Sequence, residues 1–502
     1  MKNNKNTKIE TKIETDLNKN ITTLKEIFKD ADDIIYRRLE CGKNQKIKMG
    51  VVYVDGMTNK ESVSEYAIDN LISNLDLTEL ENNPEKELQG AIAKTSISVL
   101  EVQPVLTIED SVLKILSGET VLFIDTCSKA IMLSSRGWPM RGISEPSTET
   151  VLRGARDGFN ETMKVNLTLI RRRIRDPKLK VKYIQIGSSS KTDVAIMYIE
   201  GRANENVLEI VQKRLNSIDI EAVLESSYIE ELIEDDNFSP FPQLENTERP
   251  DAAASALLEG RIVIAVDNTP TVLMAPAIFT AFMQSSEDYY ERWLSACMIR
   301  IIRYIALPIT ILLPAMYVAI TSFHPNMLPT ELALYVAASR ANVPFPAYFE
   351  AFLMELVIEL IREAATRIVG PVGSTIGLVG GLVIGQSSVE AGLITPLAVI
   401  VVALTAIASF AIPSYNFSTS LRMIRFAFIF LAATMGLFGI SIGLCILIIH
   451  LCTLKSFGIP YLSPFSSFVV NRKDLKDTII RHKINNLVHK PQYLQSKKEK
   501  GL

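Results

Sequence analysis

A long uncharged segment dominates the pattern of hydrophobic and polar positions along the chain. Between Ile368 and Leu421, 54 residues hold a single formal charge, on Glu390. Apolar runs of about 18 residues or more are typical of helices that span a lipid bilayer. A polar break over 386–392 divides the segment into apolar halves near 371–388 and 393–413. We therefore expect a hairpin of two membrane-spanning helices.

The first predicted hairpin helix has two distinct faces. One face carries residues at spacings of three, four and three: Ile376, Val379, Val383 and Gln386. The other carries glycines spaced by four, which suit close packing on a neighbouring helix: Gly377, Gly381 and Gly385. The first row is a candidate pore lining, an apolar constriction that gates by dewetting. The alternative is a row that faces lipid.

Further uncharged stretches predict membrane spans near 304–322 and 426–452, the first with a kink at Pro308 and Pro314. Between the first span and the hairpin, an amphipathic helix over 346–368 is predicted. It carries four acids along one face: Glu350, Glu355, Glu359 and Glu363. This helix suits either the membrane interface or the wall of a polar cavity. In a cavity, Glu355 or Glu359 would supply a cation-selecting ring.

Basic residues beside the spans set the expected topology. Arg300 and Arg303 precede the first span, and the tail 471–502 is basic, so the positive-inside rule places both in the cytoplasm. An even number of crossings is then required, and four spans satisfy it if the amphipathic helix does not cross. Arg422 and Arg425 would lie on the outer side, against the rule. A crossing by 346–368 would move them inside and the tail outside.

The residues before Tyr304 hold most of the charge and predict a soluble α/β head. A Lys/Asn-rich start predicts a disordered arm over 1–30, and a helical pattern begins at its end and runs from Leu24 to Ile35. The expected order is then a first α/β subdomain over 31–148, a linking helix over 149–190, and a second subdomain over 191–290. An all-α membrane bundle over 291–470, with several crossings, and the basic tail complete the chain.

Two patterns recur within the head. Val52-Tyr53-Val54-Asp55-Gly56 matches Met197-Tyr198-Ile199-Glu200-Gly201, and Gly118, Val121, Asp125 and Met132 match Gly260, Val263, Asp267 and Met274. The offsets are 145 and 142 residues. Two matches at nearly one offset predict a tandem duplication of a small α/β unit, with Asp55 equivalent to Glu200 and Asp125 to Asp267. The alternative is chance likeness, because buried strands draw on few residue types.

Two charged segments of the head are candidates for an assembly interface. The first is the basic cluster Arg171, Arg172 and Arg173 at the end of a predicted helix, where the helix dipole favours cations. The second is the run 247–251, in which charges surround a proline, and it predicts a rigid loop that bonds to a neighbouring domain or subunit. Its interface candidates are Glu248, Arg249 and Asp251.

Composition excludes several classes of function. A net charge of −3 disfavours nucleic acid as the partner. The five cysteines lack a C-x-x-C, and the four histidines lack metal-ligand spacing, so neither a disulfide framework nor a zinc site is expected. Nucleotide-binding and nucleophile-elbow motifs are missing. We therefore expect no enzyme, no metal and no cofactor. The first 20 residues lack the apolar core of a signal peptide, so the head is expected to stay in the cytoplasm.

Several segments together resemble a known family, the A subunits of bacterial spore germinant receptors. The resemblance covers about 30–470, and its motifs are Glu145-Pro146-x-x-Glu149-x-x-x-Arg153-Gly154-x-Arg156-Asp157-Gly158-Phe159, Pro240-Phe241-Pro242-Gln243-Leu244-x-x-Thr247-Glu248-Arg249-Pro250-Asp251, Leu258-x-Gly260-Arg261-Ile262-Val263-Ile264 and Gly377-Leu378-Val379-Gly380-Gly381. The Lys/Asn-rich arm and the basic tail depart from it.

The resemblance implies a multi-pass protein of the inner spore membrane that works with a multi-pass B subunit and a C-subunit lipoprotein. It implies that nutrients trigger germination and that A subunits oligomerise into a ligand-gated ion channel. A sporulation paralogue of the same fold, a non-conducting scaffold and a transporter component are the alternatives. Four or five helices can hardly enclose a pore in one chain, so a homo-oligomer is expected.

Overall fold

The structure is a computed structural model that describes residues 11–41, 47–58, 102–137, 145–146, 149–367, 381, 383–465 and 474–483. The chain forms two compact units, which are described separately. The head comprises the described residues up to Ile233 and those of 246–276, and the helical unit comprises 234–245 and the described residues from Ala277 to Lys483. The change of unit falls near Pro276, before the expected boundary at 290.

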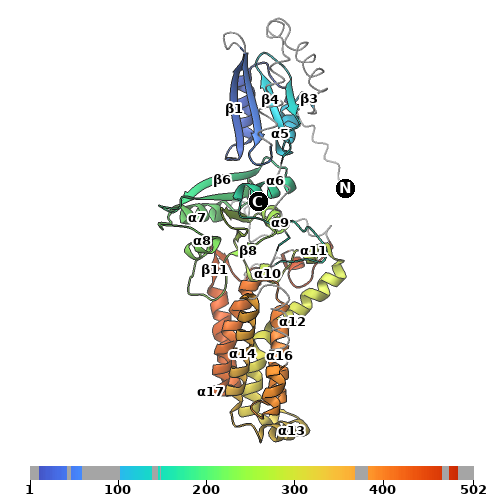
Figure 1. The fold of residues 1–502 in the computed structure, drawn as a ribbon, viewed down its shortest axis with the longest axis vertical. Helices are drawn as coiled ribbons and strands as arrows, with labels where there is room; N and C mark the ends of the chain where they lie inside the picture. The colour runs from blue at the N-terminus through green and yellow to red at the C-terminus, as the bar shows by residue number, and fades with distance from the viewer. Residues whose placement is uncertain are drawn as a thin grey trace. The chain divides into compact units, whose positions relative to one another are not determined.

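In the part of the chain that the structure describes, the first half of the head is a five-stranded sheet with two helices (Figure 1). Its elements are α1 (Leu17–Ile27), β1 (Ile34–Cys41), β2 (Ile47–Val54), β3 (Val102–Val105), α5 (Ile108–Leu116), β4 (Thr120–Ile124) and β5 (Ala130–Leu133). The strand order is β1-β2-β4-β5-β3. The structure differs from expectation twice: α1 lies in the predicted disordered arm, and Ile34 and Ile35 belong to a strand.

The second half of the head repeats this arrangement. Its elements are α6 (Met163–Arg173), β6 (Leu179–Ile186), β7 (Thr192–Ile199), α7 (Glu205–Asn216), α8 (Ser226–Ile233), β8 (Glu245–Thr247), α9 (Pro250–Glu259), β9 (Ile262–Val266) and β10 (Val272–Ala275). The order β6-β7-β9-β10-β8 is that of the first sheet, strand for strand. Each half has its own hydrophobic core.

Equivalent turns confirm the duplication in detail. The Asp125 carboxylate accepts from the backbone N–H of Leu17 at the start of α1, and Asp267 does the same for Met163 at the start of α6. The residue after each aspartate is left-handed, with φ of 70° and 69°. These aspartates therefore cap helices, because the first N–H groups of a helix lack internal partners. The repeat extends to α1 and α6, beyond the predicted boundaries.

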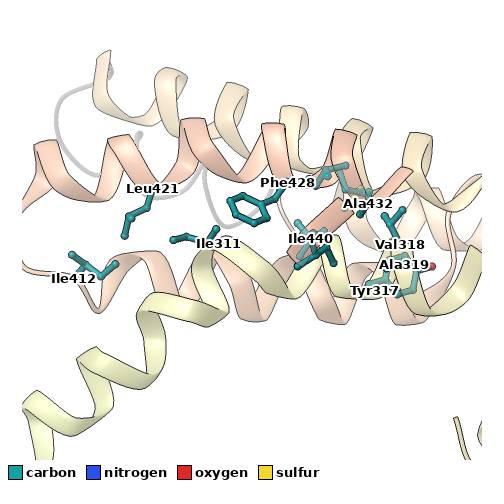
Figure 2. Packing of buried hydrophobic residues seen from close by; sticks show 14 of the residues in the cluster. Ile311, Tyr317, Val318, Ala319, Ile412, Leu421, Phe428, Ala432 and Ile440 are labelled. Atoms are coloured by element: carbon teal, nitrogen blue, oxygen red, sulfur yellow. The ribbon is translucent and has the colours of Figure 1, made fainter. Parts of the chain in front are cut away.

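The helical unit is built from long apolar helices (Figure 1). Its elements are α10 (Phe279–Phe282), α11 (Glu287–Tyr290), α12 (Trp293–Ser322), η2 (Pro325–Met327), α13 (Thr330–Arg340), α14 (Ala347–Arg367), α16 (Pro396–Phe410), α17 (Tyr415–Thr453), β11 (Lys455–Ser456), β12 (Ile459–Pro460) and η3 (Asp474–Asp477). In Figure 2, Ile311 of α12 points toward Leu421 and Phe428 of α17.

The last helix is a hairpin rather than the single span expected over 426–452. Gly436 has φ 61° and ψ −139°, which breaks the helix and reverses the chain. The start and the end of α17 meet again: the rings of Phe417 and His450 both lie within about 6 Å of Phe241, at 5.8 and 6.0 Å. The sequence pattern concealed this turn because one glycine makes it without a polar residue.

Residues before and after the bundle come together at one of its ends. The backbone N–H of Phe279 donates to the carbonyl of Tyr461 at 2.9 Å, and Arg300 binds Asp477 at 2.7 Å. The chain therefore leaves the bundle at the end where it entered. Within the described residues, α12 and α17 are long and apolar enough to cross a membrane, and α16 is a shorter apolar helix.

Candidate functional site

Three of the four predicted acids of α14 point to arginines inside the bundle. We call this set the α14 stripe; it comprises Glu350, Glu355 and Glu359 with their partners Arg340, Arg362, Arg422 and Arg425. The acids share a face because their spacings of five and four follow the helical repeat. Glu350 and Glu355 have no exposed surface, whereas the side chain of Glu359 is 27% exposed and Glu363 is exposed. The first two acids therefore carry charge into an apolar core.

The central pair of the stripe joins α14 to the first half of α17. An Nη1–H of Arg425 donates to Oε2 of Glu355 at 2.6 Å, and both side chains are completely buried. Nη2 of Arg425 also lies 3.6 Å from Oε1 of Glu359. Neither charge is exposed enough to be solvated, so each stabilises the other.

Two further arginines gather around Glu359. Nη1 of Arg362 donates to this carboxylate at 3.1 Å, and Nε of Arg422 lies 3.7 Å from it. Each guanidinium also lies over an aromatic ring, Arg362 at 5.1 Å from Phe410 and Arg422 at 5.6 Å from Tyr415. Cation–π contacts of this kind favour a cation where water is scarce.

Glu350 holds together the other end of the stripe. It accepts from Nη1 of Arg340 at 3.1 Å, from the hydroxyl of Tyr317 at 3.3 Å and from the backbone N–H of Thr395. One carboxylate thus binds α12, α13 and the start of α16. Because a buried acceptor without partners is costly, these three donors fix the helices around Glu350.

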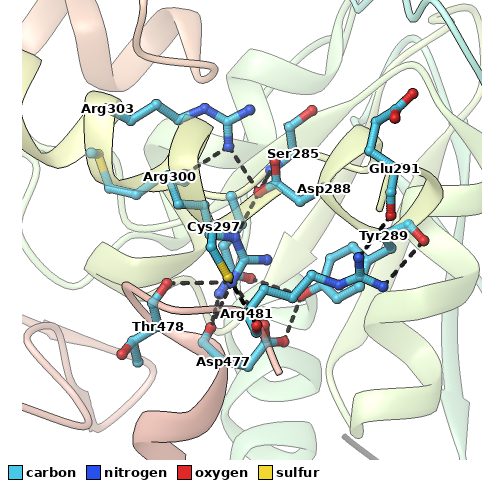
Figure 3. Close-up of polar contacts among 12 residues, drawn as sticks. Ser285, Asp288, Tyr289, Glu291, Cys297, Arg300, Arg303, Asp477, Thr478 and Arg481 are labelled. Carbon is cyan, nitrogen blue, oxygen red and sulfur yellow. Dashed lines mark hydrogen bonds and ion pairs between the residues drawn. The ribbon is translucent and has the colours of Figure 1, made fainter. Parts of the chain in front are cut away.

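A second buried cluster lies at the first turns of α12 (Figure 3). Nε of Arg300 and Nη1 of Arg303 both donate to Oδ2 of Asp288 at 2.8 Å. Arg300 also donates to Oδ1 of Asp477 at 2.7 Å, and the hydroxyl of Tyr289 donates to Oδ2 of Asp477 at 2.7 Å. We call this set, with Cys297 and Arg481, the α12 cluster.

Arg481 completes the α12 cluster from the C-terminal segment. Its guanidinium donates to the carbonyls of Glu291 and Tyr289 at 3.0 and 3.4 Å, and its own carbonyl accepts from the Cys297 thiol at 3.1 Å. Arg300 and Arg481 both lie over the Tyr289 ring, at 5.4 and 5.5 Å. The segment 474–481 is therefore bound to the entry of α12 (Figure 3).

The predicted pore face lies partly outside the described residues. Ile376, Val379 and Gly377 are not described. Val383 and Gln386 are exposed on the helical stretch 383–390, and Gln386 donates to Glu390 at 2.8 Å. A Cβ on Gly385 would lie 3.8 Å from Val399 of α16, and one on Gly381 would meet nothing within 4 Å. The pore and packing roles of these residues stay predictions.

The predicted interface residues of the head make contacts inside the head. Arg249 donates to the carbonyls of Glu149 and Ala155 at 3.1 Å and to Asp251 at 2.7 Å, and the backbone N–H of Phe159 donates to the carbonyl of Glu248. The run 247–251 thereby fixes the segment 149–159, whose motif it accompanied in the sequence.

The basic cluster also works within the head. Arg171 is buried and makes a two-pronged bond to Asp33 at 2.7 and 2.8 Å, which joins the two halves of the duplication. Arg173 binds Asp157 at 2.6 Å, and Arg172 has intermediate exposure. A role of these arginines in assembly with other chains stays a prediction.

Sequence reasoning missed the arginine partners of the α14 stripe. Arg422 and Arg425 stood out as cations between apolar stretches, but they were used only to judge the membrane topology by the positive-inside rule. The matching signal was the set of acids on 346–368, because charges at membrane depth normally pair with one another. The buried role of Pro240-Phe241-Pro242 was also missed: Phe241 is 2% exposed and packs on Phe417 and Tyr461 in the helical unit.

Comparison with known proteins identifies relatives along nearly the whole chain. Residues 22–493 match the family described as the Bacillus/Clostridium GerA spore germination protein. "Uncharacterized membrane protein YfkQ" of Bacillus subtilis is 42% identical over 97% of this chain and 93% of its own length. "Spore germination protein A1" of the same organism is 43% identical over 91% of this chain and 92% of its own.

A solved structure also matches. The crystal structure of the N-terminal domain of the A subunit of the Bacillus megaterium spore germinant receptor GerK3 is 32% identical, with a TM-score of 0.43. The match covers 54% of this chain and 99% of that one. The family match over 22–493, together with relatives above 40% identity across nine-tenths of the chain, shows that this protein belongs to the GerA family of spore germination proteins.

Proposed function

We propose that this protein is the A subunit of a nutrient-responsive spore germinant receptor and that several copies form a nutrient-gated ion channel. The observation that carries the proposal is the α14 stripe, a row of buried charges inside a bundle of apolar helices. Charges at such positions are costly and mark ion paths or moving gates in membrane proteins. The names of the relatives, which are spore germination proteins, support the receptor role.

The outer surface of the helical unit supports a membrane location. Large apolar side chains are exposed along its helices: Ile400, Leu404 and Ile407 on α16, and Met423, Phe430, Phe438, Ile446 and Ile449 on α17. A soluble protein rarely exposes so continuous an apolar surface. Charges inside and apolar side chains outside suit a protein surrounded by lipid, in the inner membrane of the spore.

The path of the chain supports a cytoplasmic head. The bundle is entered and left at one end, where Arg300, Arg303 and Arg481 gather. An even number of crossings follows, and the positive-inside rule assigns that end to the cytoplasm. A crossing α14 and the division of α17 into two halves add two crossings to the four first expected, so the number stays even. Arg422 and Arg425 then need not be placed on the outer side of the membrane, because they pair with acids of α14.

In this proposal the pore lies between copies of the chain. Val383, with Ile376 and Val379, forms an apolar constriction, and Gln386 forms a polar mouth. Glu355 and Glu359 are bound to arginines within one chain, so they act on ions only if those ion pairs open. A B subunit with several spans and a lipoprotein C subunit complete the receptor. A scaffold that does not conduct and a transporter component are the competing functions.

The test is the conductance of the purified protein in planar bilayers. Wild-type protein should show few openings without its partners and nutrient, and Val383→Ala should raise the leak because it widens the constriction. Ile384→Ala is the matched control, since Ile384 is the adjacent exposed residue at 39%. Spores with Val383→Ala should germinate without nutrient.

Three outcomes would contradict the channel. Protein that never conducts, in wild-type or Val383→Ala form, would favour the scaffold. Flux that saturates with one substrate in a single-copy protein would favour a transporter. Equal leaks in Val383→Ala and Ile384→Ala would show that the face of Val383 has no special role.

A further inference from the structure

The first turns of α12 bury a polar face and expose an apolar one, which is the reverse of a helix on the surface of a soluble protein. Their buried face is polar, with Cys297, Arg300 and Arg303 at 8, 0 and 7% exposure. Their outer face is apolar and exposed at intervals of four, three, one and three residues: Leu294, Met298, Ile301, Ile302 and Ile305, at 65, 61, 43, 50 and 56%. The intervals place the apolar residues on one stripe of the helix.

The helix is also longer than one crossing needs. Its 30 residues span about 45 Å, while the hydrocarbon core of a bilayer measures about 30 Å. The uncharged stretch 304–322 already supplies a crossing of about 28 Å. Residues 293–303 are therefore surplus to the span, yet their outer face is as apolar as the span itself.

The polar face of this segment is closed by the protein and cannot turn outward. Arg300 and Arg303 share Asp288, and Asp477 and the carbonyl of Thr478 also bind Arg300 (Figure 3). Rotating the helix to hide its apolar stripe would break these buried ion pairs and leave buried charges without a partner, which is strongly unfavourable. The apolar stripe must be covered from outside.

The start of the segment carries the residues that anchor helices at a bilayer surface. Trp293 is 39% exposed, and Nζ of Lys483 lies 5.7 Å from its ring centre. Arg292, the residue before the helix, is exposed. Tryptophan with neighbouring cations is typical of the headgroup region, where the ring meets apolar chains and the cations meet phosphates.

We propose that residues 293–303 lie in the plane of the membrane interface, with the apolar stripe in lipid, before the chain turns into the bilayer at 304. The lipid surface is the partner of this face, and the α12 cluster fixes its rotation. This inference rests on the membrane location proposed above. In Figure 1 the first turns of α12 lean away from the other helices. Pro308 and Pro314 lie farther along the same helix.

Intrinsic fluorescence tests the placement without labels. The chain has two tryptophans, Trp138 and Trp293, so Trp138→Phe leaves Trp293 alone. The full-length variant is reconstituted in vesicles with and without brominated lipid, which quenches nearby tryptophan. Trp293 emission should fall in brominated vesicles, and iodide added to the water should have little effect.

Two added variants separate this inference from the membrane location itself. In a background with Trp138→Phe and Trp293→Phe, Phe430→Trp places the probe on the exposed outer face of α17, and Leu224→Trp places it on the exposed surface of the head. The first should be quenched by bromine and the second by iodide. If Phe430→Trp fails to respond to bromine, the membrane location is wrong and the inference falls with it.

Two outcomes would overturn the inference while the membrane location stands. Iodide quenching of Trp293, with Phe430→Trp still quenched by bromine, would place 293–303 in water. Protection of Trp293 from both quenchers would show that a second copy or another part of the receptor covers the stripe. Bromine quenching of both probes supports the interfacial helix.

Discussion

Charge inside the helical unit is stabilised by specific pairs of residues. Glu355 and Arg425 lie 2.6 Å apart and are both fully buried, and Glu359 shares Arg425 at 3.6 Å. At a buried position a single charge costs several kcal/mol, while in a pair with good geometry the mutual attraction nearly offsets the loss of hydration. Periodicity predicted the acids of α14, because helical spacing is visible in the sequence. It could not predict Arg425 as the partner, 70 residues away, because pairing depends on how the helices pack.

Removing one member of this pair should harm the protein more than removing both. We expect Glu355→Gln to lower the free energy of unfolding by about 3–5 kcal/mol, because Arg425 keeps only the longer contact to Glu359. Glu355→Leu combined with Arg425→Met should cost clearly less. Thermal unfolding in detergent measures both, with Glu331→Gln as the control because Glu331 is exposed on α13. A double variant as unstable as the single ones would show that the pair is not coupled.

Glu225 predicts a pH dependence in the head. Burial raises the pKa of this carboxyl, but hydrogen bonds from Ser226, Ser227 and Thr269 outweigh it and lower the pKa to about 2. The folded state therefore binds fewer protons than the unfolded one. The stabilisation is present above about pH 4.5 and is lost as the pH falls toward 2.

Glu225→Gln should thus destabilise the head near pH 7 and matter less in acid. We expect about 1–2 kcal/mol at pH 7, since the partly exposed site is screened by water. Urea unfolding of the full chain, followed by a probe in the head, measures the difference at pH 7 and pH 3. The exposed Glu209→Gln is the matched control. A difference that stays constant with pH would exclude the charge as its cause.

At the scale of elements, α17 shows that hydropathy alone cannot detect a turn within an apolar stretch. An average over a window reports an apolar stretch, and the two halves of α17 form one such stretch. The reversal depends on Gly436 alone, whose backbone angles other residues rarely adopt. Gly439 and Gly443 then let the halves approach, since a Cβ on Gly443 would lie 3.0 Å from the Phe428 ring. A polar break over 386–392 marks the predicted hairpin 371–413, of which residues 381 and 383–413 are described.

Gly436→Ala should prevent the hairpin from forming. A Cβ at this position would lie 3.0 Å from the Cβ and Cγ atoms of Phe323 and 3.1 Å from Nε2 of His324, in a backbone conformation that alanine disfavours. We expect most of the folded protein in membranes to be lost. Gly385→Ala is the control, because its Cβ would make an ordinary 3.8 Å contact with Val399. Comparable amounts of both variants after detergent extraction would contradict the prediction.

At the scale of the whole molecule, the two-part division was visible in the sequence, because charge is concentrated in one half. The tandem repeat was visible too, since its turns require Gly56 and Gly201 at positive φ, and Asp125 and Asp267 as helix caps. The stretch 234–245 was predicted to belong to the second subdomain, 191–290, but it belongs to the helical unit. It lies in sequence between two parts of the head, yet Phe241 packs in the helical unit, and only the folded arrangement reveals this.

The channel proposal requires more than one copy of the chain in each assembly. The mass of the detergent-solubilised receptor should therefore correspond to a complex with two or more copies of the 55.8 kDa chain. Native mass spectrometry of the complete complex measures the number, and the protein denatured in the same detergent gives the reference for one copy. A single copy per complex would contradict a pore between subunits.

The pairing of α14 with α17 also has a consequence for the order in which the chain is synthesised and inserted into the membrane. Ribosomes release the chain from its first residue onward, so Glu355 enters the membrane well before Arg422 and Arg425 are made. A carboxylate waiting alone in lipid is unfavourable and can take up a proton meanwhile. The two arginines would arrive on a helix that is otherwise apolar, and their counter-charges would already be at the right depth. Chains that stall before Arg425 should therefore be unstable intermediates, which quality-control proteases can recognise by an unpaired acid.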